Sequence, residues 1–300
     1  MVKTGADLPS RALGDIPPFA APAPLYYVRP VLLLAWSHNR YHDLPADEVL
    51  RRVRLAGVHG LIVKYGDPAF ERAVAAAGVP YGVERFAYVG QAEREGAMLA
   101  DAVAAGAAFA VANCEPNDGG GWGDPGADAA ARRLIDAFRR RQPQAPLWVC
   151  ADLRRGRSLD APFVREAARG GINGWMPMVY PKAFRTSVAS AFDAAYPGAR
   201  YLGLPCAPVI QTYDDIGADA VRAQVEEARR RGATAISAYV IETANDDEVR
   251  ALRTAVGDPR PTDAATLQAA ALAYRQGAIA ILDHGTPAEL ASWGRLFAGG

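Results

Sequence analysis

The segment HGLIVKYGDPAFERAVAAAG, residues 59–78, contains the unit that most of the chain repeats. It starts with an apolar run over residues 61–63, which suits a strand that is buried on both faces. Asp67 is a good N-cap residue, and the residues after it place apolar side chains three and four positions apart, as in an amphipathic helix. Gly78 suits the left-handed backbone that follows many helices. The segment therefore predicts one strand followed by one helix.

The same pattern recurs along the chain, and helix-ending glycines such as Gly57 and Gly198 accompany it. Apolar runs cover residues 28–36, 59–66, 79–89, 107–116, 145–153, 172–181, 199–210 and 234–243, and each is followed by a helical pattern. Strands that alternate with helices form parallel sheets. Eight such units predict an α/β fold, a closed (β/α)8 or TIM barrel.

The alternative fold is an open doubly wound sheet. That architecture usually carries a glycine-rich phosphate-binding turn after its first strand, and the segment LAWSHNRYH (residues 34–42) contains no such turn. The rest of the chain divides into three predicted parts. Residues 1–24 form an extended arm rich in Pro, Ala and Gly, residues 25–257 form the barrel, and residues 258–300 form a C-terminal helical extension. We expect that extension to pack on the barrel or to bind an assembly partner.

Charge and composition limit the classes of partner. The 33 basic and 33 acidic residues give a net charge of zero, which argues against a nucleic-acid-binding surface and leaves neutral sugars as partners. The three cysteines are far apart and form no metal-binding CxxC pair. His38 and His42 have HxxxH spacing, but the segment is predicted to be a loop and offers no third ligand. We therefore expect neither a metal nor another cofactor.

Neither a membrane helix nor a signal peptide is predicted from the sequence. No run of the sequence approaches the roughly 20 apolar residues of a membrane helix, so no membrane association is expected. The first 27 residues lack the apolar core of a signal peptide, which predicts synthesis in the cytoplasm without export by that route. To reach an external glycan, the protein would then have to be released by lysis or carried in a phage-like virion.

In a barrel of this kind, the active site lies at the carboxyl ends of the strands. These ends are rich in aromatic, amide and carboxylate side chains, which suit a hydroxyl-rich ligand such as a glycan. The candidate substrate-binding residues there are Trp36, Trp122, Asp152, Met178, Gln211, Tyr239 and Glu242. Trp122 belongs to the segment GGGWG (residues 119–123), which we interpret as a lid or substrate loop.

The fourth predicted strand ends in the segment FAVANCEP, residues 109–116. Asn113 and Glu115 are two positions apart, so on a strand both side chains would point to the same side, toward the barrel mouth. Glycoside hydrolysis is the chemistry that needs carboxylates and no histidine or cysteine nucleophile.

Asn113-Cys114-Glu115 on the fourth strand and Met178-Val179-Tyr180 on the sixth resemble motifs of barrel glycoside hydrolases that use substrate-assisted catalysis. Family 18 chitinases end strand 4 in D-x-E and place a tyrosine on strand 6, family 85 endo-β-N-acetylglucosaminidases use N-x-E, and family 25 lysozymes carry D-x-E. The resemblance implies that Glu115 is the general acid and that Asn113 orients the substrate's 2-acetamido group. It also implies that Tyr180 bonds that group or the attacking water.

The sequence departs from the patterns of these and other barrel glycosidases in three places. The first predicted strand has Ala-Trp-Ser at residues 35–37, where the family 25 lysozymes have an acidic D-x-S start. The longer D-x-x-D-x-D-x-E signature of family 18 is missing, since Phe, Ala, Val and Ala occupy residues 109–112. The large clan of retaining barrel glycosidases needs a glutamate nucleophile at the end of strand 7, where this chain has Pro-Cys-Ala-Pro at residues 205–208.

Three functional hypotheses follow. The first is a glycosidase that acts on an N-acetylhexosamine-containing polysaccharide such as peptidoglycan or a chitin-like glycan. The second is a catalytically degenerate barrel that binds glycan or serves as a structural part of a phage-like particle. The third is a small-molecule lyase or aldolase that uses Lys64, although no phosphate-binding glycine turn follows the seventh and eighth strands.

Overall fold

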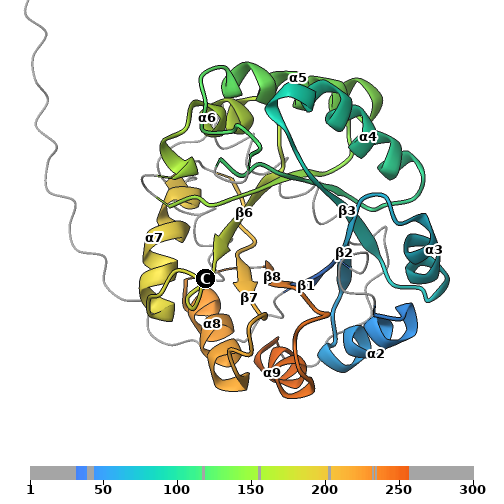
Figure 1. The fold of residues 1–300 in the computed structure, drawn as a ribbon, viewed down its shortest axis with the longest axis vertical. Coiled ribbons are helices and arrows are strands. Elements are labelled where there is room, and N and C mark those ends of the chain that lie inside the picture. Colours follow the sequence, from blue (N-terminus) through green and yellow to red (C-terminus); the bar gives the residue numbers. More distant parts are fainter. Residues whose placement is uncertain are drawn as a thin grey trace, which may run out of the picture.

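The structure is a computed structural model that describes residues 32–38, 44–116, 119–154, 157–201, 204–231, 233 and 235–256. Its eight parallel strands pair in chain order, and the first also pairs with the eighth, so the sheet is a closed barrel. The helices surround the strands (Figure 1). The predicted (β/α)8 barrel is confirmed, and the pairing of the first and eighth strands excludes the open sheet.

Strands and helices alternate along the chain. The strands are β1 (Leu32–Ser37), β2 (Gly60–Lys64), β3 (Tyr81–Phe86), β4 (Ala110–Asn113), β5 (Leu147–Ala151), β6 (Gly174–Val179), β7 (Val209–Gln211) and β8 (Ala235–Tyr239). The α-helices are α2 (Ala46–Ala56), α3 (Pro68–Ala76), α4 (Ala92–Ala104), α5 (Ala127–Arg141), α6 (Pro162–Arg169), α7 (Val188–Tyr201), α8 (Ala218–Arg230) and α9 (Asp246–Val256). Two short 3-10 helices precede α4 and α6, at Val89–Gln91 and Ser158–Asp160.

The unit at residues 59–78 folds as predicted. The Asp67 side chain accepts a hydrogen bond from the Phe70 backbone N–H at 3.0 Å and so caps α3. Gly78 follows that helix with a φ of 70°, a left-handed value that a glycine adopts without strain.

The predicted boundary after α7 is wrong. The helix continues past Gly198 to Tyr201, and β7 has only three residues, which begin at Val209. A single glycine inside a helix costs only about 1 kcal/mol relative to alanine, and the residues after it, Ala199 and Arg200, favour the helical state. Glycine alone is therefore too weak a signal to end this helix.

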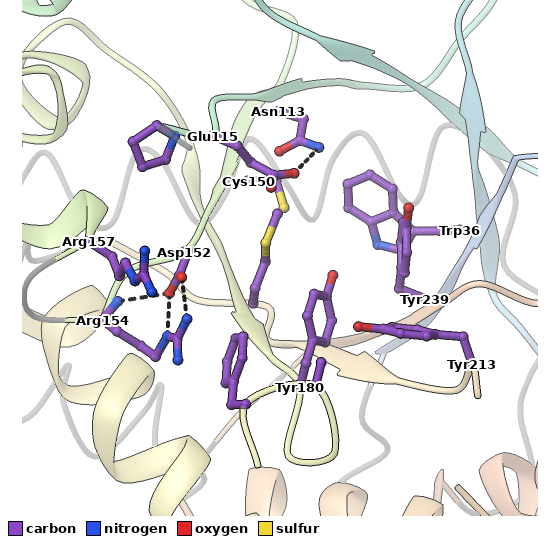
Figure 2. Close-up of a pocket in the computed structure, with 14 residues that line it drawn as sticks. Trp36, Asn113, Glu115, Cys150, Asp152, Arg154, Arg157, Tyr180, Tyr213 and Tyr239 are labelled. Carbon is purple, nitrogen blue, oxygen red and sulfur yellow. Dashed lines mark hydrogen bonds and ion pairs between the residues drawn. The ribbon is translucent and has the colours of Figure 1, made fainter. Parts of the chain in front are cut away.

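Side chains of β4 alternate between two cores. Phe109 and Val111 pack in the cluster inside the barrel, whereas Ala110, Ala112 and Cys114 pack in the cluster under α4 and α5. This alternation continues beyond the strand, so the side chains of residues 113 and 115 belong to the inner side. The carboxyl ends of the strands surround a pocket there (Figure 2).

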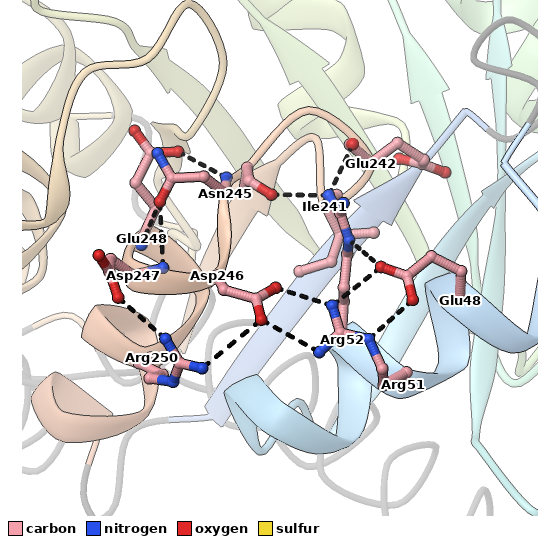
Figure 3. Close-up of polar contacts among 11 residues, drawn as sticks. Glu48, Arg51, Arg52, Ile241, Glu242, Asn245, Asp246, Asp247, Glu248 and Arg250 are labelled. Atoms are coloured by element: carbon pink, nitrogen blue, oxygen red, sulfur yellow. Dashed lines mark hydrogen bonds and ion pairs between the residues drawn. The ribbon is translucent and has the colours of Figure 1, made fainter.

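Polar contacts between α2 and the segment after β8 reinforce the closure of the barrel (Figure 3). Arg52 Nη1 donates hydrogen bonds to the backbone oxygens of Ile241, Glu242 and Ala244, at 3.2, 2.7 and 2.6 Å. Glu48 accepts a hydrogen bond from Arg52 Nε at 2.9 Å, which fixes the guanidinium in place. One side chain therefore satisfies three carbonyls at the junction of the first and last units.

The other predicted parts of the chain, residues 1–24 and 258–300, lie outside the described residues, so the assembly role of the extension stays a prediction. Within the described part of the chain, no helix combines the length and the apolar character needed to cross a membrane.

We expect Arg52→Ala to lower the free energy of unfolding by at least about 2 kcal/mol, because carbonyls left without a donor cost about 1–3 kcal/mol each when buried. Urea denaturation measures this change. The control is Arg54→Ala, an exposed arginine of the same helix, which should change stability by no more than about 0.5 kcal/mol. Equal losses in the two variants would contradict the role given to Arg52.

Candidate functional site

The barrel mouth holds a pocket of about 430 Å³. The predicted site residues that line it are Trp36, Asn113, Glu115, Asp152, Met178, Tyr180 and Tyr239. They come from the ends of five strands, so the pocket exists only because the sheet closes. Further lining residues are Pro116, Cys150, Arg154, Arg157, Ala183, Phe184 and Tyr213.

Asn113 and Glu115 form the polar centre of the pocket. Asn113 Nδ2 donates a hydrogen bond to Glu115 Oε1 at 2.8 Å (Figure 2). The two side chains are therefore on the same side of the chain, as their spacing predicted. Asn113 is only 7% exposed, and its Oδ1 accepts no hydrogen bond from the described residues. The amide thus orients the carboxyl group of Glu115, and its own oxygen is buried.

A buried charged cluster lies beneath this pair. Glu84, from β3, is fully buried, and its carboxylate is 2.8 Å from Lys64 Nζ and 3.7 Å from His38 Nε2. Burial raises the pKa of Glu84, while the Lys64 ammonium and the Asn113 amide oppose that rise. The Asn113 amide therefore favours the charged form of the buried Glu84 and also bonds the carboxyl group of Glu115 in the pocket.

Lys64 is committed to this cluster. Its ammonium group contacts both carboxylate oxygens of Glu84, and the residue does not line the pocket. A lysine that forms a Schiff base must present a neutral amine to the substrate. The ion pair therefore weighs against the lyase or aldolase hypothesis.

Aromatic side chains form the wall opposite the arginines (Figure 2). The ring of Tyr180 lies 5.6 Å from that of Tyr213 and 5.9 Å from that of Tyr239, and Trp36 lies 5.7 Å from Tyr239. Burial raises the pKa of Tyr213 to about 12 and raises that of Tyr180 well above its ordinary value. These phenols are therefore neutral at physiological pH and can donate hydrogen bonds, while their faces suit the apolar face of a sugar ring.

The remaining side of the pocket is built from the segment after β5. Arg154 Nε and Nη2 donate to the two oxygens of Asp152, at 2.8 and 2.6 Å, and the guanidinium lies 3.5 Å from the centroid of the Phe184 ring. Asp152 therefore lines the pocket as half of a bidentate ion pair. Of the two carboxylates in the pocket, one is paired with an arginine and the other, Glu115, is bonded to an amide.

The structure does not bring Trp122 into the pocket. Its side chain is fully buried, its indole N–H donates to the Ala87 carbonyl at 2.7 Å, and its ring lies 5.3 Å from that of Phe163. The tryptophan thus anchors the glycine-rich loop to the core, and this use of the ring replaces the predicted stacking on a sugar.

Gln211 and Glu242 are also buried outside the pocket lining. Gln211 Oε1 accepts hydrogen bonds from the backbone N–H groups of Lys182 and Ala183, so it supports the loop after β6. Glu242 accepts a short hydrogen bond from the Ser37 hydroxyl, between the ends of β8 and β1. Both residues support loops or strand ends around the barrel mouth, and neither lines the pocket.

Sequence reasoning missed several lining residues. Cys150 could have been found, since it precedes Asp152 by two positions and so faces the same side. Arg154, Arg157 and Phe184 follow their strands within loops, where no periodicity predicts which way a side chain points. Among the residues that the structure describes, no group of three or more His, Cys, Asp or Glu side chains could hold a metal ion. His38 packs against Trp36 and Tyr239, and His42 lies outside the described residues.

Comparison with family models and with curated protein sequences finds no match. Solved structures do resemble the fold. A GH2 β-galacturonidase from Eisenbergiella tayi gives a TM-score of 0.57 at 9% identity, over 77% of this chain and 52% of that one. A chitinase from Chromobacterium violaceum gives 0.53 at 12% identity, over 76% of this chain and 99% of that one. A class V chitinase from Pseudomonas fluorescens gives a TM-score of 0.54 at 10% identity, over 76% of this chain and 100% of that one.

This chain thus spans about half the length of the galacturonidase and nearly the whole length of the chitinases. At these identities, the likeness establishes a shared barrel fold, one that several glycoside hydrolases have. The fold alone does not determine the reaction.

Burial raises the pKa of Glu242 from its ordinary 4.5 to about 7, and the Ser37 hydrogen bond opposes this rise. Because the folded state binds this proton more tightly than the unfolded state, stability falls as the pH rises from 4.5 to about 7 and then levels off. The loss amounts to about 3 kcal/mol. Glutamine stays neutral and keeps an acceptor for Ser37. We therefore expect Glu242→Gln to match the wild type near pH 4.5 and to exceed its stability above pH 7.

Urea denaturation at the two pH values measures the difference. Glu93→Gln, at an exposed position of α4, is the control and should show no such change with pH. A difference between wild type and Glu242→Gln that is the same at both pH values would disprove the assignment.

Proposed function

We propose that the chain is a glycoside hydrolase-like barrel that acts on an N-acetylhexosamine-containing glycan such as peptidoglycan, with Glu115 as the general acid. The observation that carries this proposal is the hydrogen-bonded Asn113–Glu115 pair at the centre of a pocket walled by tyrosines and a tryptophan. A carboxyl group, an amide and aromatic faces are the groups that a glycosidase of this kind uses.

In the proposed reaction, Glu115 transfers its proton to the glycosidic oxygen as the bond from that oxygen to the anomeric carbon breaks. The carbonyl oxygen of the 2-acetamido group bonds to the anomeric carbon and forms a cyclic oxazolinium intermediate. Water then attacks that carbon, the ring reopens, and the carboxylate of Glu115 takes the proton from the water. Asn113 orients the acetamido group, and the Tyr180 hydroxyl orients that group or the water.

The surroundings of the other carboxylates support the substrate as its own nucleophile. Asp152 is held by Arg154 in a bidentate pair, and Glu84 is buried beneath Asn113 in contact with Lys64. A protein nucleophile would need a carboxylate that reaches the anomeric carbon. A substrate that brings its own acetamido oxygen removes that need, which favours N-acetylated sugars over unacetylated ones.

The second candidate function is glycan binding without cleavage, by a degenerate barrel that acts as a structural part of a phage-like virion. The observation that favours it is the apolar run before Asn113, where the acidic series of the family 18 enzymes is missing. Both candidates use the same pocket and the same class of ligand, and they differ in turnover. Export in a virion, or release by lysis, belongs to the proposal in either case.

We expect Glu115→Gln to lower kcat on an N-acetylated glycan at least about 100-fold, because a general acid contributes about 100- to 10,000-fold to the rate. Release of reducing ends from peptidoglycan and from chitooligosaccharides measures this. The matched control is Glu226→Gln, the same change at an exposed position of α8, which should retain wild-type turnover. Turnover in the Glu115 variant equal to wild type would refute the assignment of the acid, and a wild type inactive on every N-acetylated glycan would favour the binding function.

A thiazoline analogue of N-acetylglucosamine should inhibit wild-type turnover competitively, because it mimics the cyclic intermediate that the acetamido group forms. Asn113→Ala should weaken this inhibition more than it raises KM, since the amide contact is proposed to strengthen in that intermediate. Steady-state inhibition kinetics with both proteins measures the two effects. Indifference of the wild type to the thiazoline would point to a nucleophile other than the acetamido group.

A further inference from the structure

Among the residues that the structure describes, the charged side chains that line the pocket are Glu115, Asp152, Arg154 and Arg157. The other titratable lining groups, Cys150 and the tyrosines at 180, 213 and 239, are neutral because burial raises the pKa of each. When Glu115 is protonated, as a general acid must be, two arginines face one carboxylate. Two positive charges minus one negative charge leave the pocket with a net charge of +1, in a protein whose overall charge is zero.

The two arginines are held differently. Arg154 is fixed by the bidentate pair with Asp152 and by the Phe184 ring. Arg157 is an exposed lining residue, and no acidic side chain of the described residues forms an ion pair with it. Its backbone N–H donates to the Arg154 carbonyl at 3.1 Å, and both residues lie on the same side of the pocket (Figure 2). The excess positive charge is therefore that of Arg157.

We propose that Arg157 forms a subsite for the carboxylate of an acidic sugar, adjacent to the N-acetylhexosamine whose bond is cleaved. A guanidinium matches a carboxylate with two parallel N–H···O bonds, which fixes the orientation of the sugar as well as its charge. This inference rests on the proposed function for the position of the cleaved bond. The carboxylate contact itself can be measured without cleavage.

The single excess positive charge in the pocket indicates which kind of anion it would bind. One uncompensated positive charge balances a single carboxylate, whereas a phosphate monoester carries about −1.5 to −2 at neutral pH. Two sugars would supply the carboxylate: a uronic acid, which carries it on the ring, and an N-acetylmuramic acid, which carries it on a lactyl ether. Both present the same group to Arg157. The subsite therefore favours an acidic amino-sugar glycan over neutral chitin.

Binding by the Glu115→Gln variant of the full chain tests the subsite, since glutamine keeps the acid position neutral and slows turnover. Isothermal titration calorimetry would compare three tetrasaccharides: chitotetraose, a hyaluronan tetrasaccharide with glucuronate, and a peptide-free peptidoglycan tetrasaccharide with muramic acid. We expect at least one acidic ligand to bind about tenfold more tightly than chitotetraose, as one charge-assisted hydrogen bond would provide. Added salt should weaken the binding of the acidic ligand and leave that of chitotetraose unchanged.

Substitutions of Arg157 in the Glu115→Gln background test whether this side chain is responsible for the preference for acidic ligands. Arg157→Gln should lower the ratio of acidic to neutral affinity to about one. Arg157→Lys should keep part of the preference, because lysine retains the charge but lacks the planar fork. The matched control is Arg222→Gln, an exposed arginine of α8, which should leave the ratio as it is. Thermal denaturation of each variant confirms that it is folded.

The outcomes separate the two proposals. Equal affinity for acidic and neutral ligands, or a ratio that Arg157→Gln does not change, overturns the subsite, and cleavage of chitotetraose by the wild type would then leave the proposed function standing. Failure to bind any of the three ligands, together with no cleavage by the wild type, overturns both. A preference that only one acidic ligand shows supports the subsite and identifies the source of its carboxylate.

Discussion

Pairing of β1 with β8 is the constraint on which the pocket depends. The register of Leu32 with Ala235 and of Ala35 with Ala238 closes the sheet, and Arg52 on α2 fixes the same junction from outside. Closure brings the end of β1 beside the end of β8, so the rings of His38 and Tyr239 lie 5.1 Å apart. An open sheet of the same strands would leave Trp36 and Tyr239 at opposite edges, and the aromatic wall would lose the tryptophan.

Closure also explains which parts of the site could be predicted from the sequence. The strand–helix rhythm and the two-residue period are local, and together they place Asn113 and Glu115 inside the barrel mouth. Trp122 and Gln211 depend on distant partners instead. The indole N–H bonds the carbonyl of Ala87, and the Gln211 side chain bonds the backbone N–H groups of Lys182 and Ala183. No local pattern contains those partners, and a polar or aromatic residue near a strand end can satisfy a buried loop as readily as a ligand.

The arginine side of the pocket was beyond sequence analysis for a related reason. Arg154 and Arg157 lie after β5, where the chain turns, and neither strand nor helix periodicity governs the direction of their side chains. The pairing of Arg154 with Asp152 also bears on the predicted role of Asp152, because this carboxylate lines the pocket as half of an ion pair. A carboxylate at a strand end is a candidate catalytic residue when the sequence alone is known. A carboxylate that is paired with a guanidinium mainly neutralises the charge of that arginine.

The identity of residue 113 follows from the charges around it. Glu84 is buried against Lys64, and Glu115 lies in the pocket on the other side of Asn113. An aspartate at residue 113 would place a third carboxylate between these two, with one lysine to balance them, and repulsion would oppose their ionisation. The Asn113 amide instead donates a hydrogen bond to Glu115 and favours the charged form of Glu84 without adding charge. The barrel can therefore keep a fully buried carboxylate directly beneath the pocket, while the Asn113 amide holds the carboxyl group of Glu115.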